Sequence, residues 1–98
     1  MVFKLELPDE ALSDLDQAID WYNLQKPDLG NYFYFEVLET FQQLEQHPNH
    51  YGFFIEEYRQ AILKNFPYRI VFKIINDNVV VLGIVHTSRS DNELFKRL

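Results

Sequence analysis

The sequence predicts a small α+β domain in which an N-terminal strand and an antiparallel helical hairpin pack on an antiparallel β-sheet, in the order β-α-α-β-β-β. Three observations support this class. Helical spacing of apolar residues fills most of the first half, strand patterns fill the second half, and 98 residues with 47% apolar side chains suffice for one hydrophobic core. We therefore expect residues 1–98 to form a single domain.

The first half of the chain has the pattern of one strand followed by two helices. Residues 2–7 alternate between apolar and polar side chains, the period of a half-buried strand, and Pro8 ends it. Residues 9–46 carry apolar side chains at helical spacing, with a break at Pro27 and Gly30. So short a connection predicts two antiparallel helices that share an apolar face. The apolar positions are Leu12, Leu15, Ile19 and Tyr22, then Phe33, Val37, Phe41 and Leu44.

The second half of the chain carries strand signals at close intervals. Residues 58–64, 68–75 and 79–87 are rich in β-branched and aromatic side chains, and residues 76–78 supply polar turn residues between the last two. We expect an antiparallel meander that the N-terminal strand joins. The polar tail, residues 88–98, has the composition of a short helix.

Aromatic residues crowd the two predicted helices, and packing in the core is the expected role of most of them. Four of them are consecutive, from Tyr32 to Phe35. Because this run spans more than one helical turn, its rings cannot all face one core. At least one or two of them should be exposed unless another chain covers them.

Charge is distributed unevenly along the sequence. Residues 1–57 hold two lysines and twelve carboxylates, a balance of −10, whereas residues 58–98 have a balance of +4. This asymmetry predicts either two faces with different partners or neutralisation of one part by the other across the fold. The net charge of −6 argues against direct binding of duplex DNA or of an anionic membrane. No apolar run is long enough to span a bilayer and no leader pattern is visible, so we expect a cytoplasmic protein.

Several kinds of chemistry are excluded by the motifs that the sequence lacks. Without cysteine there is no disulfide framework, thiolate metal site or cysteine nucleophile. The three histidines do not form a metal-ligand pair at helical spacing, and neither a phosphate-binding glycine loop nor a nucleophile elbow is present. We therefore expect no metal and no cofactor.

The basic side chains of the strand region are the candidate site residues. Arg59, Arg69, Lys73 and Arg89 lie on or at the ends of three consecutive strands, where they either bind phosphates and carboxylates or pair with neighbouring acids as solvated salt bridges. Their convergence on one face depends on the strand register. His86 follows the most apolar strand and stands close to Arg89, a pair that suits acid-base chemistry on a phosphoryl group. The structural alternative for His86 is a strand-end histidine bonded to a hydroxyl or carbonyl.

Four short motifs lie along the chain in an order and spacing that are specific when taken together. They are Asp14-Leu15-x-x-Ala18-x-x-Trp21-Tyr22, Pro27-x-Leu29-Gly30-x-x-Phe33, Phe66-Pro67-Tyr68-x-Ile70-x-Phe72 and Val85-His86-x-x-Arg89, with Pro48 and Arg59 between the second and third. Over nearly the whole chain this pattern resembles the ParE branch of the RelE/ParE toxin superfamily, whose helical hairpin on a sheet matches the predicted elements.

The resemblance implies a toxin of a type II toxin-antitoxin module, of the plasmid stabilisation and growth inhibition type. It also implies a cognate antitoxin, encoded beside the toxin, that lays a C-terminal segment over this domain and silences it. We expect that segment to cover apolar surface and to place carboxylates near Arg59, Arg69 and Arg89.

Two activities occur in the superfamily, ribosome-dependent cleavage of messenger RNA and poisoning of DNA gyrase without nuclease chemistry. The nucleases are usually strongly basic and carry a C-terminal aromatic residue such as tyrosine, whereas this chain is acidic and residues 92–98 hold no tyrosine. We therefore expect binding of a protein target such as DNA gyrase. The alternative is an endoribonuclease acting on the ribosome and messenger RNA, with His86 and Arg89 as catalytic residues. A second alternative is an interaction module without toxicity.

Overall fold

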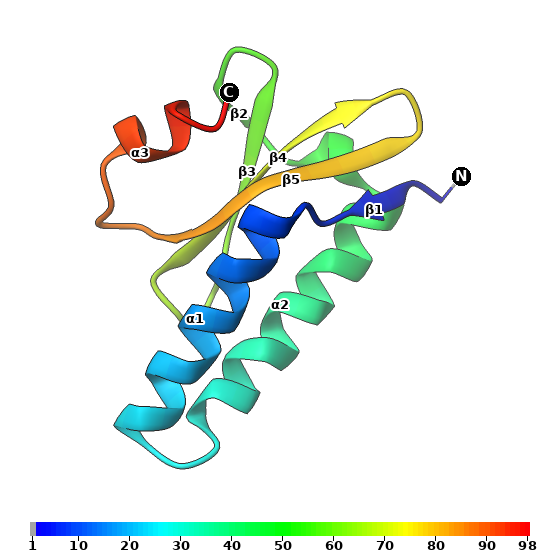
Figure 1. Ribbon diagram of the computed structural model, residues 1–98. Coiled ribbons are helices and arrows are strands. Elements are labelled where there is room, and N and C mark those ends of the chain that lie inside the picture. The colour runs from blue at the N-terminus through cyan, green and yellow to red at the C-terminus, as the bar shows by residue number, and fades with distance from the viewer. Residues whose placement is uncertain (1) are drawn as a thin grey trace.

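The computed structural model describes residues 2–98 and has the element order β-α-α-β-β-β-β with a short C-terminal helix (Figure 1). This confirms the predicted class, the helical hairpin and the final three strands. The elements are β1 (Lys4–Glu6), α1 (Asp9–Gln25), α2 (Leu29–Gln46), the 3₁₀ turn η1 (Pro48–His50), β2 (Phe53–Ile55), β3 (Tyr58–Ile62), β4 (Tyr68–Ile75), β5 (Asn78–His86) and α3 (Asp91–Phe95). No helix within residues 2–98 combines the length and apolar character needed to span a membrane.

The five strands form one sheet in the order β1-β5-β4-β3-β2, which is mixed rather than wholly antiparallel. Neighbours among β2, β3, β4 and β5 are antiparallel, as the short turns between them require. The exception is β1, which runs parallel to β5 with Leu5 opposite Val79. No hairpin turn links these two strands, so the local signals that predict antiparallel pairing elsewhere do not fix the direction of β1.

Strand β2 is an addition to the predicted order. Its three residues, Phe53 to Ile55, are all apolar and show no alternation, so the sequence carries no strand period there. The strand pairs with the edge of β3, where Phe53 lies opposite Arg59 and contacts its guanidinium. The turn that follows places Glu56 at φ 47°, in the left-handed region.

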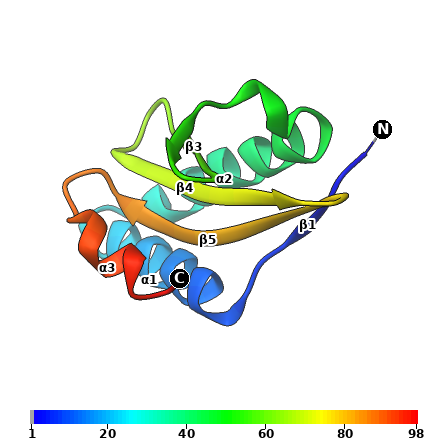
Figure 2. The ribbon, with the colours of Figure 1, turned by 90° about the horizontal axis from the view of Figure 1, so that it is seen from above.

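Both long helices lie side by side on one face of the sheet (Figures 1 and 2). Their close approach depends on Gly30, whose N–H donates to the Asn23 side-chain oxygen at 2.7 Å. The shared apolar face and the sheet enclose the main core, in which Phe33, Leu44 and Phe72 are fully buried. A smaller cluster lies on the other face of the sheet, where Leu94 of α3 is buried. Its other buried members are Tyr58, Val71 and Val85.

The run of aromatic residues in α2 divides as the sequence predicts. Phe33 is fully buried, whereas Tyr32 and Phe35 are 66% and 60% exposed and Tyr34 is 39% exposed. Phe33 belongs to an aromatic cluster that ties the hairpin to the sheet, with ring centroids 5.3 Å from Tyr22 and 5.0 Å from Tyr68. Such edge-on and tilted contacts add to the stabilisation from burial. They also fix the position of Tyr22 and Tyr68, which line the pocket described next.

Candidate functional site

A pocket of about 640 Å³ opens between α1 and the ends of β4 and β5, and we call it the α1–β5 pocket. Its position follows from the sheet register, because Tyr68 at the start of β4 lies opposite His86 at the end of β5. Helix α1 closes the other side. The side chains that matter for its chemistry are Trp21, Tyr22, Tyr68, His86, Ser88 and Arg89, with Asp14 and Gln17 at one side.

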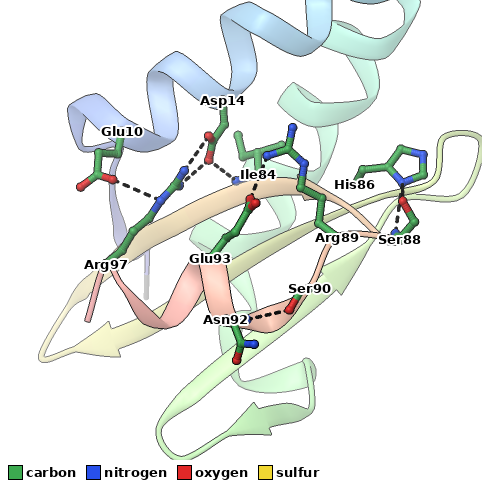
Figure 3. A network of polar contacts seen from close by, with 10 residues as sticks. All are labelled: Glu10, Asp14, Ile84, His86, Ser88, Arg89, Ser90, Asn92, Glu93 and Arg97. Atoms are coloured by element: carbon green, nitrogen blue, oxygen red, sulfur yellow. Dashed lines mark hydrogen bonds and ion pairs between the residues drawn. The ribbon is translucent and has the colours of Figure 1, made fainter.

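His86 is held at the mouth of this pocket by the turn that follows β5. Its Nδ1 accepts a hydrogen bond from the Ser88 backbone N–H at 3.1 Å and lies 2.7 Å from the Ser88 hydroxyl oxygen (Figure 3). Because Nδ1 is an acceptor, this arrangement fits the neutral ring with its proton on Nε2. The ring also stacks edge-on against Tyr68 at 5.3 Å between centroids. This is the strand-end arrangement that the sequence offered as the structural alternative.

Arg89 lies in the segment between the end of β5 and the start of α3. Its Nη1 donates to Glu93 at 3.0 Å, and both side chains are about 60% exposed, at 58% and 62%. Within residues 2–98 the Nε and Nη2 groups have no acceptor. The guanidinium therefore keeps donors available for a ligand.

Two tyrosine hydroxyls line the same pocket as proton donors. Burial raises the pKa of Tyr22, with a smaller contribution from Tyr68. Burial is also the largest cause of the raised pKa of Tyr68, which nearby Arg89 lowers and Asp14 raises. Neither hydroxyl has a hydrogen-bond partner in the part of the chain that the structure describes. Both are therefore protonated near neutral pH and free to donate to an acceptor in the pocket.

A polar network that sequence reasoning missed borders the pocket and ties α1 to β5 and α3. Asp14 accepts two hydrogen bonds from Arg97, at 2.6 and 2.9 Å, and a third from the Ile84 backbone N–H at 3.0 Å (Figure 3). Arg97 also contacts Glu10 at 3.2 Å and donates to the Leu82 carbonyl at 3.2 Å. The sequence shows an acid on the first helix, Asp14, and an arginine in the tail, Arg97. No local spacing indicates that these two residues pair, because they are far apart in sequence.

Arg69 and Lys73 lie on the face of the sheet that points away from the hairpin. Arg69 is 8% exposed, donates to Asp91 at 2.5 Å and lies over the Phe54 ring. Lys73 lies 3.9 Å from Glu57 and over the Tyr58 ring. Both cations therefore have intrachain partners.

Arg59 faces the opposite side. Directly opposed residues of an antiparallel pair share a face, and Arg59 is opposite Phe72, which belongs to the main core. Its guanidinium donates to the Tyr51 carbonyl at 2.6 Å and lies 3.9 Å from the centre of the Phe53 ring. The structure thus brings His86 and Arg89 together, puts Arg69 and Lys73 on another face, and separates Arg59 from both pairs.

A second hollow lies between α2 and β3, with a volume of about 520 Å³, and we call it the α2–β3 groove. Exposed Tyr32 and Phe35 line it from the helix, and Ile62, 62% exposed, lines it from the strand. Strand β2 pairs with Tyr58 and Arg59, and the Gln60 N–H donates to the Gly52 carbonyl at 3.2 Å. Within residues 2–98 the outer edge of β3 at Ile62 has no neighbouring strand. No group of three histidine or carboxylate side chains suited to a metal ion occurs within residues 2–98.

The fold of this chain is similar to those of two solved structures. The chain superposes on a structure titled "Chromosomal ParDE TA system from P. aeruginosa" with a TM-score of 0.77, at 20% identity over 87% of this chain and 96% of that one. A mutant of the E. coli toxin RelE in the free state gives a TM-score of 0.63, at 14% identity over 99% of this chain and 94% of that one. At such identities the likeness shows the fold alone.

The family is shown by the sequence. The pattern that defines the ParE toxin of the type II toxin-antitoxin system, parDE, matches residues 5–91. The chain belongs to this family, which confirms the resemblance stated above. No curated protein matches the chain.

Proposed function

We propose that this chain is the toxin of its module, that an antitoxin silences it, and that it acts by binding a protein target, with DNA gyrase as the candidate. The observation that carries the choice over RNA cleavage is the dispersal of the basic side chains. Arg69 and Lys73 pair with Asp91 and Glu57 on one face, so that of the four basic candidate residues Arg89 alone lies with His86 in the α1–β5 pocket. Cleavage at a 2′-hydroxyl needs an acid and a base within hydrogen-bond reach of one reacting group.

The α2–β3 groove is the surface that best supports an antitoxin site. An extended segment would add to the free edge of β3 at Ile62 through backbone hydrogen bonds, and its apolar side chains would cover Tyr32 and Phe35. Carboxylates of the antitoxin near Arg69 would first have to displace Asp91, whereas Arg89 has its Nε and Nη2 groups without an acceptor in residues 2–98 beside its contact with Glu93. The groove therefore supports the expectation that the antitoxin covers apolar surface. The expected contacts between antitoxin carboxylates and Arg59, Arg69 or Arg89 stay a prediction.

Induction of the chain alone in cells tests the toxin role. We expect growth arrest, filamentation and DNA damage with messenger RNA intact, and restored growth when the neighbouring small reading frame is co-expressed. Unimpaired growth at a verified level of soluble protein would contradict the proposal and would favour the interaction module without toxicity.

One observation favours the endoribonuclease as a second candidate. His86, Arg89 and the Tyr68 hydroxyl line one pocket, which assembles an imidazole, a guanidinium and a phenol. On that hypothesis, mapping of transcript 5′ ends soon after induction finds new cuts at defined codons, and His86→Ala abolishes them. Transcripts without new ends during arrest would reject it.

A further inference from the structure

We infer that the α1–β5 pocket receives an acidic side chain of the protein target, with a neighbouring apolar side chain of that target against Trp21. This inference rests on the proposed function, because it names the chemistry by which the target is recognised. The pocket volume, about 640 Å³, is that of a site for a side-chain cluster or a small ligand.

The donors of the pocket point to an anionic acceptor. Arg89 keeps its Nε and Nη2 groups without an acceptor in the described chain, and the hydroxyls of Tyr22 and Tyr68 are likewise unpartnered there. These groups present N–H and O–H donors around one hollow, and a carboxylate is the side chain that accepts several such hydrogen bonds at once.

Trp21 supplies the apolar half of the site. The indole is 55% exposed although it stands on the helix that also carries the core residues Leu15, Ala18 and Tyr22. It contacts Tyr22 edge-on at 5.4 Å between ring centroids, so the indole packs against a residue of the core. A fixed, half-exposed tryptophan beside an arginine is the composition that dominates binding energy at protein interfaces.

The surrounding charge selects a protein segment over a nucleic acid. Asp14 lies in the pocket wall and Glu93 contacts Arg89, so a strand of phosphates would meet carboxylates on both sides. Residues 1–57, which include α1, have a balance of −10. A single carboxylate needs only the local donors, whereas a polyanion is repelled by the wider surface.

The first test measures colony formation after induction of single variants. Trp21→Ala and Arg89→Gln should each weaken growth arrest at least about tenfold, the size expected for loss of a central interface contact. Arg89→Lys, which keeps the charge, should retain most of the arrest. Leu24→Ala, an 83% exposed apolar residue of the same helix outside the pocket, is the matched control and should arrest growth as the wild type does.

The results separate the two proposals. If the wild type does not arrest growth, the proposed function fails and this inference fails with it. If the wild type arrests growth and both pocket variants do so equally well, with circular dichroism confirming that they are folded, the pocket inference alone is overturned.

A second test addresses the acidic partner with purified chain. Trp21 is the only tryptophan, so its fluorescence reports on the pocket. Acetyl-Leu-Glu-Leu-Glu-amide should bind at least about fivefold more tightly than the same peptide with glutamine, and Arg89→Gln should remove this preference. Equal binding of the two peptides, no response to the glutamate peptide, or tighter binding of an eight-nucleotide oligothymidylate would overturn the inference.

Discussion

Asp14 and Arg97 form hydrogen bonds with backbone groups at the outer edge of β5. Strand β1 pairs with β5 from Asn78 to Val80, and beyond that point the outer edge of β5 has no partner strand among residues 2–98. Asp14 accepts from the Ile84 N–H and Arg97 donates to the Leu82 carbonyl, which satisfies backbone groups that would otherwise be unpaired. The same pair holds the C-terminal residues against α1.

Arg97→Gln should therefore lower the free energy of unfolding by about 2 kcal/mol, because Asp14 is then left largely buried without its cation. The side chains of Arg97 and Asp14 are 21% and 15% exposed. Arg89→Gln breaks the exposed pair with Glu93 and should cost less than about 1 kcal/mol. Urea denaturation followed by circular dichroism measures both, and equal losses for the two variants would contradict the role given to Arg97.

Tyrosine ionisation predicts a loss of stability at alkaline pH. Burial raises the pKa of Tyr22, Tyr51 and Tyr68 above the ordinary value of 10.0, so the folded chain holds these protons more tightly than the unfolded chain. Their contribution is complete below pH 10 and declines as the pH rises toward the folded pKa values. We expect the free energy of unfolding to fall above pH 10 and to fall less steeply in Tyr68→Phe. Denaturation at a series of pH values checks the slope, and identical slopes would contradict it.

At the scale of elements, the contact between α1 and α2 depends on the absence of a side chain at Gly30. A Cβ there would lie 2.6 Å from Asn23 Cγ and would collide with the Ile19 carbonyl. Alanine normally stabilises a helix relative to glycine, but here we expect Gly30→Ala to lower the free energy of unfolding by about 1–3 kcal/mol. Gly52 is the control, because a Cβ there would meet no atom of residues 2–98 within 4 Å. Gly52→Ala should change stability little in the same thermal denaturation. A stabilised Gly30→Ala variant would refute this close packing.

Elements with a strong local period were predictable from the sequence. Both helices of the hairpin, β4 and β5 follow from apolar spacing and turn residues, and the structure confirms them within a few residues. Strand β2 was not predictable, because its three apolar residues show no alternation. The direction of β1 was not predictable, because its partner β5 is distant in sequence.

The candidate site was predictable only in part, for the same reason. His86 and Arg89 are close in sequence and do line one pocket. Trp21 and Tyr22 join them only because α1 packs over the end of β5, and Asp14 meets Arg97 only in the folded chain. The register of β3 also determines the face on which Arg59 lies. A shift of one residue would have placed Arg59 on the same face as Arg69.

For the whole molecule, the uneven charge finds a partial explanation in pairing across the fold. Arg97 contacts Glu10 and Asp14 of the acidic half, and Lys73 contacts Glu57. Neutralisation thus accounts for these cations. In the described part of the chain Arg89 pairs only with exposed Glu93, and it remains available at the α1–β5 pocket. The two interpretations of the charge pattern each apply to part of the basic segment.

The proposed mode of action is tested most directly with purified DNA gyrase, a supercoiled plasmid and the purified chain. After protein is removed with detergent and protease, we expect linear plasmid to accumulate in proportion to the chain added, only when gyrase is present, and less with Trp21→Ala. A stoichiometric excess of folded chain that leaves supercoiling and plasmid form unchanged, while induction in cells cuts translated transcripts at defined codons, would contradict the account.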